Sequence, residues 1–197
     1  MPIILSSNHD REDAEGQPTQ WIGTDPAMIT YHGLAICISI TCLVERDGQA
    51  MLAGAHLIPY SKPDEVKRCL RQFARIGSNP LAVWVVGWVE KWGTGPDGSI
   101  NTSGLTYDPA DGGTLLAAIW KALAFRGEIK VYDLAQAQER AYGYHVIARS
   151  LGNAVTFECK CLQSQIIDMN AAQTKTIARS RVPPSGEASH GRRCVVM

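Results

Sequence analysis

The chain has 197 residues, enough for one domain with a substantial core but too few for two full domains. Hydrophobic residues make up 45% and charged residues 19%, which is typical of a globular protein and excludes a disordered or fibrous chain. The 19 basic and 19 acidic residues cancel, so no net field favours nucleic acid, and no apolar run reaches the roughly 18 residues that a membrane span requires.

Residues 1–29 are predicted to be a polar N-terminal leader. Most of this stretch is rich in Ser, Asp, Glu, Gln, Gly and Pro. It lacks the basic segment and long apolar segment of a secretory signal, so we expect a cytoplasmic protein. In a reducing compartment the six cysteines are expected to be thiols.

The next part of the chain is predicted to form a hairpin, a helix and a strand. Two strands are expected over 33–45 and 50–58, joined by a turn at Arg46-Asp47-Gly48-Gln49. A helix is expected over 62–76, and the apolar run 81–90 is expected to be a strand covered on both faces. One apolar stripe of this helix consists of Val66, Cys69, Leu70 and Phe73.

Residues 91–112 are rich in Gly, Asp and Pro and are predicted to be a loop. A second helix is expected over 114–125, a strand over 128–134 and a closing hairpin over 142–160. This order of elements predicts a single α/β domain over 30–163, with a mixed β-sheet packed against helices.

The register of the first hairpin decides which of its side chains meet. If Asp47 and Gly48 are the two central residues of the turn, Ser39 lies opposite His56 and Cys37 lies opposite Ile58. Cys37 and His56 are then diagonal neighbours on one face, with Cα atoms about 7–8 Å apart. A three-residue loop or a bulge would instead put them on opposite faces.

Alternation assigns different roles to the two faces of the first strand. The face expected to be the core side carries Ile36, Ile38, Ile40, Cys42 and Val44. The more polar face carries Cys37, Ser39, Thr41 and Leu43. Cys42 is therefore predicted to be a packing residue, whereas Cys37 lies on the less apolar side.

A thiol beside an imidazole can act as a nucleophile. The imidazole takes the thiol proton, the thiolate attacks a carbonyl carbon, and water resolves the resulting thioester. The alternative is that Cys37 and His56 are both packing residues, because cysteine is among the most buried residue types and a lone histidine is usually structural.

The stretches "GLAICISITCLV" and "AGAHLIP" resemble the signature of the CheD chemoreceptor glutamine deamidases, and the order of elements is similar over about 30–161. The resemblance implies that Cys37 is the nucleophile and His56 the general base, that the substrate is a glutamine side chain of a protein, and that no cofactor is needed. The catalytic domains of cytotoxic necrotizing factor toxins, which deamidate a glutamine of Rho-type GTPases, share this fold.

The chain departs from that family at two places. Ala35-Ile36 stands where the family has a small Gly-Ser pair, and Tyr31 stands where the family has the Thr that supports its base. The resemblance makes the hydroxyl of Tyr31, or of the adjacent Thr30, the candidate for orienting His56. Two alternatives stay open: a non-catalytic binding module on the same fold, and a cysteine protease or transglutaminase that uses the same dyad.

Residues 164–197 are predicted to be a flexible tail that ends in a lipidation signal. Cys194 and the three residues after it fit the C-a-a-X pattern, and a terminal Met favours farnesyl transfer to the cysteine. Arg192 and Arg193 add positive charge that suits an anionic membrane. The pattern predicts membrane anchoring in eukaryotic cytosol, either of a eukaryotic protein or of a secreted bacterial effector. The alternative is a tail that fits by chance.

No metal site is predicted. Cys159 and Cys161 have no partner pair at zinc spacing, so they are expected to be strand thiols. His145 lies in the closing hairpin, where a place on a sheet face is expected.

Overall fold

The computed structural model describes residues 2–7, 20–58, 63–87, 106–108, 113–134, 143–152, 154–161, 166–167 and 174–177. The strands are β1 (Ile3–Leu5), β2 (Ile22–Asp25), β3 (Met28–Leu34), β4 (Ile38–Arg46), β5 (Gln49–Leu57), β6 (Ala82–Gly87), β7 (Thr106–Asp108), β8 (Gly113–Thr114), β9 (Ile129–Asp133), β10 (Tyr144–Leu151), β11 (Ala154–Cys161), β12 (Ile166–Ile167) and β13 (Thr174–Ile177). The helices are α1 (Pro63–Gly77) and α2 (Leu115–Leu123).

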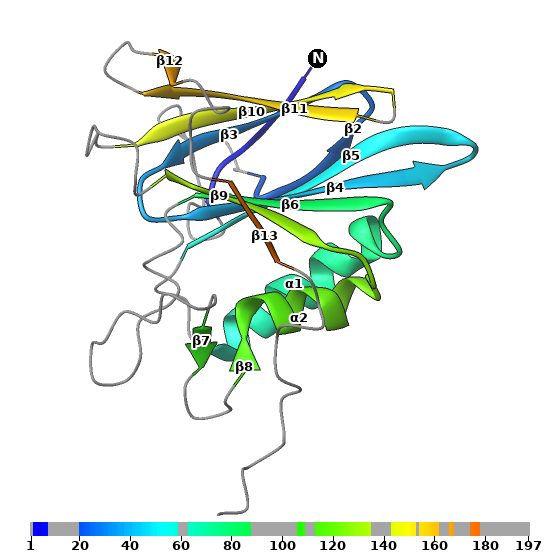
Figure 1. The fold of residues 1–197 in the computed structure, drawn as a ribbon, viewed down its shortest axis with the longest axis vertical. Coiled ribbons are helices and arrows are strands. Elements are labelled where there is room, and N and C mark those ends of the chain that lie inside the picture. The colour runs from blue at the N-terminus through cyan, green and yellow to red at the C-terminus, as the bar shows by residue number, and fades with distance from the viewer. Residues whose placement is uncertain are drawn as a thin grey trace, which may run out of the picture.

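The protein is a mixed α/β fold in which strands dominate. Six strands form one sheet in the order β13-β9-β6-β4-β5-β2, and five form a second in the order β1-β3-β10-β11-β12. Both sheets are mixed, since β6 and β9 run parallel and so do β1 and β3. Figure 1 shows α1 and α2 on one side of the six-stranded sheet and the five-stranded sheet on the other. Neither of the two described helices is long and apolar enough to cross a membrane.

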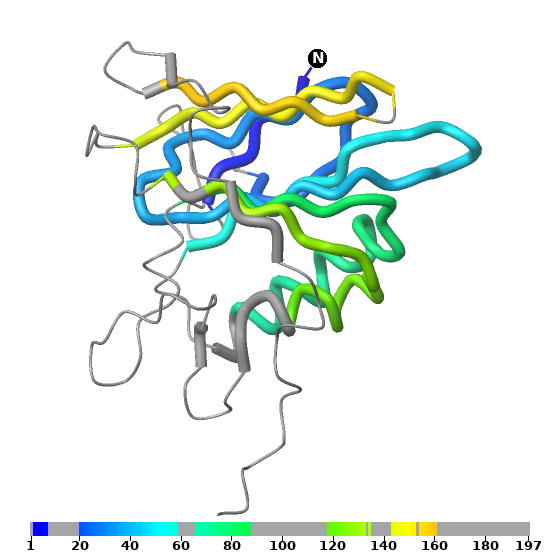
Figure 2. Tube along the Cα trace, in the orientation of Figure 1, coloured from blue at the N-terminus to red at the C-terminus, as the bar shows by residue number. Residues whose placement is uncertain are grey.

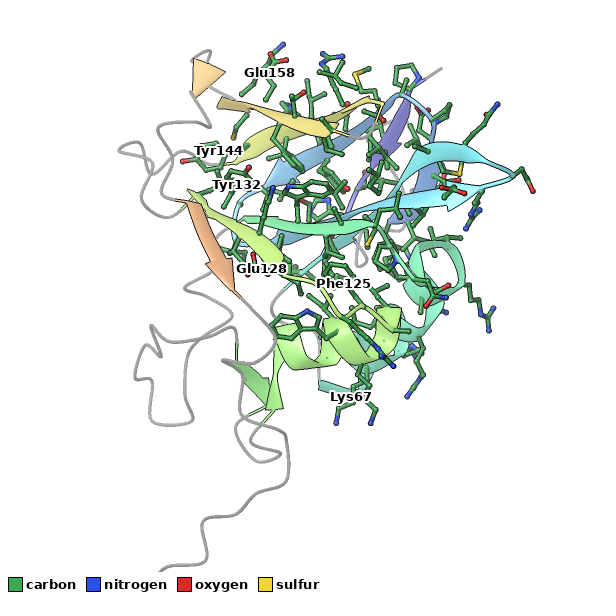
Figure 3. The ribbon with its side chains drawn as sticks, turned by 45° about the vertical axis from the view of Figure 1, so that its right-hand side comes forward. Lys67, Phe125, Glu128, Tyr132, Tyr144 and Glu158 are labelled. Carbon is green, nitrogen blue, oxygen red and sulfur yellow. The ribbon has the colours of Figure 1, made fainter. Side chains whose placement is uncertain are left out.

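One hydrophobic core lies between the helices and the six-stranded sheet. The four residues of the predicted α1 stripe are all buried there, so that prediction is confirmed. Phe125, which follows α2, faces the same core (Figure 3). The indole of Trp120 donates a hydrogen bond to the carbonyl of Gly127 (2.9 Å), which ties the end of α2 to the approach to β9.

A second core lies between the two sheets. Leu43, Leu52 and Trp84 from the six-stranded sheet meet Tyr31 and Val146 from the other. The six-stranded sheet is therefore buried on both faces, as the uninterrupted apolar sequence of β6 predicts. The tube in Figure 2 shows the resulting layers of strands above the helix pair.

The predicted strand over 33–45 is divided between the two sheets. β3 ends at Leu34, and β4 begins at Ile38 in the other sheet. Gly33 has a left-handed φ of 69° and lies in a bulge, where three steps along β3 match two along β10. The apolar sequence runs through this crossing without a break, and only the glycine marks it.

The stretch 1–29, predicted to be a leader, contributes β1, β2 and the first two residues of β3 to the fold. β1 pairs with β3, and Leu5 is fully buried between the sheets, while β2 pairs with β5. Each of these strands is short, and polar residues dominate the composition of the stretch as a whole. Strands β12 and β13 likewise fall within the predicted tail 164–197.

Phe73 tests the packing of α1. We expect Phe73→Ala to lower the free energy of unfolding by about 3–5 kcal/mol, because the ring is fully buried against the six-stranded sheet. Arg71→Ala, at an exposed position of the same helix, should change it by no more than about 0.5 kcal/mol. Urea denaturation measures both, and equal effects would contradict this packing.

Candidate functional site

The β4–β5 hairpin has the predicted register. Arg46 pairs with Gln49 across a two-residue turn, and Ser39 pairs with His56. Asp47 and Gly48 have φ of 52° and 73°, the left-handed pair that matches the twist of a tight hairpin. The even-membered turn required for Cys37 and His56 to share a face is therefore present.

Cys37 comes immediately before β4, two positions ahead of Ser39. Its side chain belongs to the core between the sheets and is 6% exposed. Its backbone is packed against Gly87 at the end of β6, where an added Cβ would collide with the Cys37 carbonyl oxygen. Gly87 also has a φ of 152°, so only glycine suits this position.

His56 lies near the end of β5 and is 1% exposed. Its Nδ1 is 3.2 Å from the carbonyl oxygen of Leu5, and its backbone N–H donates to the carbonyl of Trp21 (2.9 Å). Because a carbonyl oxygen can only accept, Nδ1 carries the proton, and in the neutral ring the lone pair is on the buried Nε2. The imidazole is thus held in the tautomer that a general base needs.

The structure places Cys37 and His56 on the same side of the six-stranded sheet, facing the five-stranded sheet. The side chain of Ser39, between them in the register, also points into this layer and donates to the carbonyl of Val86 (3.1 Å). This polar face was expected to be the less buried one. It is instead fully covered, since Ser39 and Thr41 have no exposed surface.

The Tyr31 hydroxyl does not reach His56. It donates to the carbonyl of Ile40 (3.2 Å) and shares a hydrogen bond with the Thr41 hydroxyl (2.7 Å). Burial raises the pKa of Tyr31 above its usual range, which keeps the phenol neutral. Thr30 alternates to the other face of the five-stranded sheet, so neither candidate hydroxyl orients the imidazole.

The group that orients His56 is the Leu5 carbonyl, which sequence reasoning missed. Leu5 pairs with Tyr31 in register, so β1 brings its backbone to the edge of the site. Every residue has a backbone carbonyl, so residue types do not indicate which carbonyl accepts this hydrogen bond. Only the short apolar run Ile3-Ile4-Leu5, ahead of the polar stretch, could have indicated a strand there.

The thiols of the described cysteines differ in their surroundings. Cys37, Cys42, Cys69 and Cys159 are all buried and reduced. Cys42 lies in the core on the helix side, and burial raises the pKa of its thiol above the usual range. The prediction that Cys42 is a packing residue is confirmed. Among the residues with described positions, no group of three or more His, Cys, Asp or Glu could hold a metal ion.

A concavity of about 500 Å³ lies away from these residues. It is found at the start of β3, whereas Cys37 follows the end of that strand. Its lining residues are Pro2, Asp25, Pro26, Ala27, Met28, Arg149, Ser150 and Leu151.

Comparisons of the chain with protein-family models, curated proteins and solved structures gave no match. The candidate function rests on the geometry of Cys37 and His56.

The contact between Gly87 and Cys37 can be tested by substitution. Gly87→Ala should lower the free energy of unfolding by about 3 kcal/mol, because it adds a collision to the strained φ. Gly48→Ala is the matched control: it has a left-handed φ but open space around it, so we expect about 1–2 kcal/mol. Urea denaturation compares the two, and an equal loss would show that β6 does not press on Cys37.

Proposed function

We propose that this protein is a cysteine hydrolase that deamidates a glutamine side chain of a protein substrate, with Cys37 as nucleophile and His56 as general base. The observation that carries the proposal is the hairpin register, which pairs Ser39 with His56 and brings Cys37 to the same layer. The resemblance of the two hairpin segments to the CheD deamidases supports the same roles, and the mixed α/β architecture is compatible with a CheD-like fold.

The proposed reaction begins when Nε2 of His56 accepts the proton of the Cys37 thiol. The thiolate attacks the side-chain amide carbon of glutamine, and the C–N bond breaks as the imidazolium returns the proton to the leaving ammonia. Water then adds to the thioester, with its proton passing to Nε2, and the C–S bond breaks to release glutamate. Glutamine and water are thereby converted to glutamate and ammonia.

The Leu5 carbonyl supports this cycle by its position. Its hydrogen bond to Nδ1 fixes the plane of the ring, and the carbonyl dipole stabilises the imidazolium that forms after proton transfer. In this proposal Leu5 has the orienting role that the resemblance assigns to a threonine. Tyr31 is a packing residue that fixes β3 to β4.

Alkylation tests the dyad without knowledge of the substrate. At pH 7, Cys37 of the wild type should react with iodoacetamide at least about tenfold faster than Cys37 of His56→Gln, because a free thiol is only a few per cent ionised at this pH. Cys42 is a poor reference, since its complete burial alone would slow it. Peptide mass spectrometry follows each thiol separately.

Two further results complete this test. Tyr31→Phe should leave the Cys37 rate unchanged, since its hydroxyl contacts Thr41 and Ile40 and not His56. Equal Cys37 rates in wild type and His56→Gln would contradict the dyad.

The reaction itself is tested on a protein extract from eukaryotic cells. The wild type should produce the Gln-to-Glu mass increase at specific glutamines, and Cys37→Ala should not. Cys42→Ala, which removes a thiol on the opposite face of the same strand, should retain activity. Incorporation of added amine would indicate a transglutaminase and peptide cleavage a protease, whereas no product would favour the binding module.

A second candidate function is a non-catalytic binding module on the same fold. The near-complete burial of both groups, 6% exposed for Cys37 and 1% for His56, favours it. So does the engagement of the Tyr31 hydroxyl away from the imidazole.

We also propose that the chain is prenylated at Cys194 and recruited to membranes in eukaryotic cytosol. This rests on the C-a-a-X pattern and on Arg192 and Arg193, which lie outside the described residues. Expressed in eukaryotic cells, the wild type should be recovered with membranes and Cys194→Ser in the soluble fraction. Arg192→Ala with Arg193→Ala should weaken but not abolish binding, because the lipid supplies the hydrophobic part. Membrane binding by Cys194→Ser equal to that of the wild type would overturn this part.

A further inference from the structure

Two histidines lie side by side on the outer face of the five-stranded sheet. The rings of His32, on β3, and His145, on β10, have centroids 4.3 Å apart and planes tilted by 55°. The neighbours Tyr31 and Tyr144 are buried in the inter-sheet core, so alternation directs both imidazoles outward. The bulge at Gly33 sets this arrangement, because it puts both His32 and Gly33 opposite His145.

His32 is exposed and His145 is partly exposed on this face. Within the described part of the chain, neither ring makes a hydrogen bond, and their interactions are with each other and with the charge of Lys160. Imidazole binds a metal through an unprotonated ring nitrogen, and each of these two rings has one such nitrogen in its neutral form.

We propose that His32 and His145 together bind one divalent ion of the copper, nickel and zinc group, bridging β3 and β10. Imidazole nitrogen is a preferred ligand of these metals. When two imidazoles bind one metal ion through bonds of about 2.0–2.1 Å that lie at a right angle to each other, the ring centroids are about 4.5 Å apart. The observed separation of 4.3 Å is close to this value, so the backbones of β3 and β10 already hold the two rings at a distance that one ion can bridge.

The charged groups near the pair are of both signs. Lys160 lies opposite His145 on β11, and its ammonium is 3.1 Å from Glu158, whose carboxylate is also 3.6 Å from Arg149. Figure 3 shows Glu158 at the outer layer of the molecule. The carboxylate partly offsets both cations. Two protein ligands leave the remaining coordination positions to water, and this differs from the closed sites that use three or more side chains.

Calorimetric titration of the full chain with Ni²⁺ tests the site. Ni²⁺ is suitable because it favours imidazole and does not oxidise thiols. The wild type should bind one Ni²⁺ per chain, and His32→Ala or His145→Ala should each weaken binding at least about tenfold. The double variant should lose binding at this site, because each single variant still keeps one of the two imidazoles. Far-UV circular dichroism confirms that these outward-facing substitutions leave the fold intact.

Two matched variants sharpen the result. Lys160→Gln should tighten binding about threefold, because it removes a positive charge beside the pair. His56→Gln should bind like the wild type, since its ring is buried between the sheets and is not part of the pair. Binding that is unchanged in both alanine variants, or no binding by the wild type, would overturn the proposal. Neither result bears on Cys37, so this site stands or falls independently of the proposed hydrolase.

Discussion

The pairing of β4 with β5 is the constraint on which the candidate site depends. The turn at Asp47 and Gly48 has two residues, and a strand has a side-chain period of two, so the turn determines which side of the sheet every hairpin residue faces. A single inserted residue would move His56 to the helix side of the sheet and leave Cys37 where it is. Local turn geometry thereby controls whether a thiol and an imidazole share an environment.

Burial on both faces gives this environment its character. In a sheet covered on one face only, the polar side chains of the other face contact water, but here the second sheet covers them. Their hydrogen-bond partners lie within the protein: Ser39 contacts Val86, Thr41 contacts Tyr31, and His56 contacts Leu5. Gly54, opposite Thr41, lets the second sheet come this close, because an added Cβ would lie 2.6 Å from the Tyr31 hydroxyl oxygen. A polar stripe in a sequence can thus lie in a buried interface as well as on an exposed surface.

The sequence predicts the elements whose signals are local. The Asp-Gly turn, the stripe of α1 and the apolar run of β6 each lie within a few residues, and each prediction is confirmed. The division of the predicted strand 33–45 and the role of Leu5 depend on contacts between distant segments. The apolar sequence continues through the point near Gly33 where the chain passes from one sheet to the other, so the pattern does not indicate that the strand divides. The acceptor on Leu5 is a backbone carbonyl, which no residue type indicates. The shared face of Cys37 and His56 was predictable because it follows from the even-membered turn, whereas the Leu5 carbonyl that contacts the imidazole was not.

The contact between Leu5 and His56 spans 51 positions, while the hairpin closes through a two-residue turn. Closing a long stretch of chain costs more entropy, so such contacts tend to form after local ones. We therefore expect the hairpin register to form before His56 acquires the acceptor that fixes its orientation. A chain that lacks the segment through Leu5 would keep the hairpin turn but lose the hydrogen bond that fixes the plane of the imidazole.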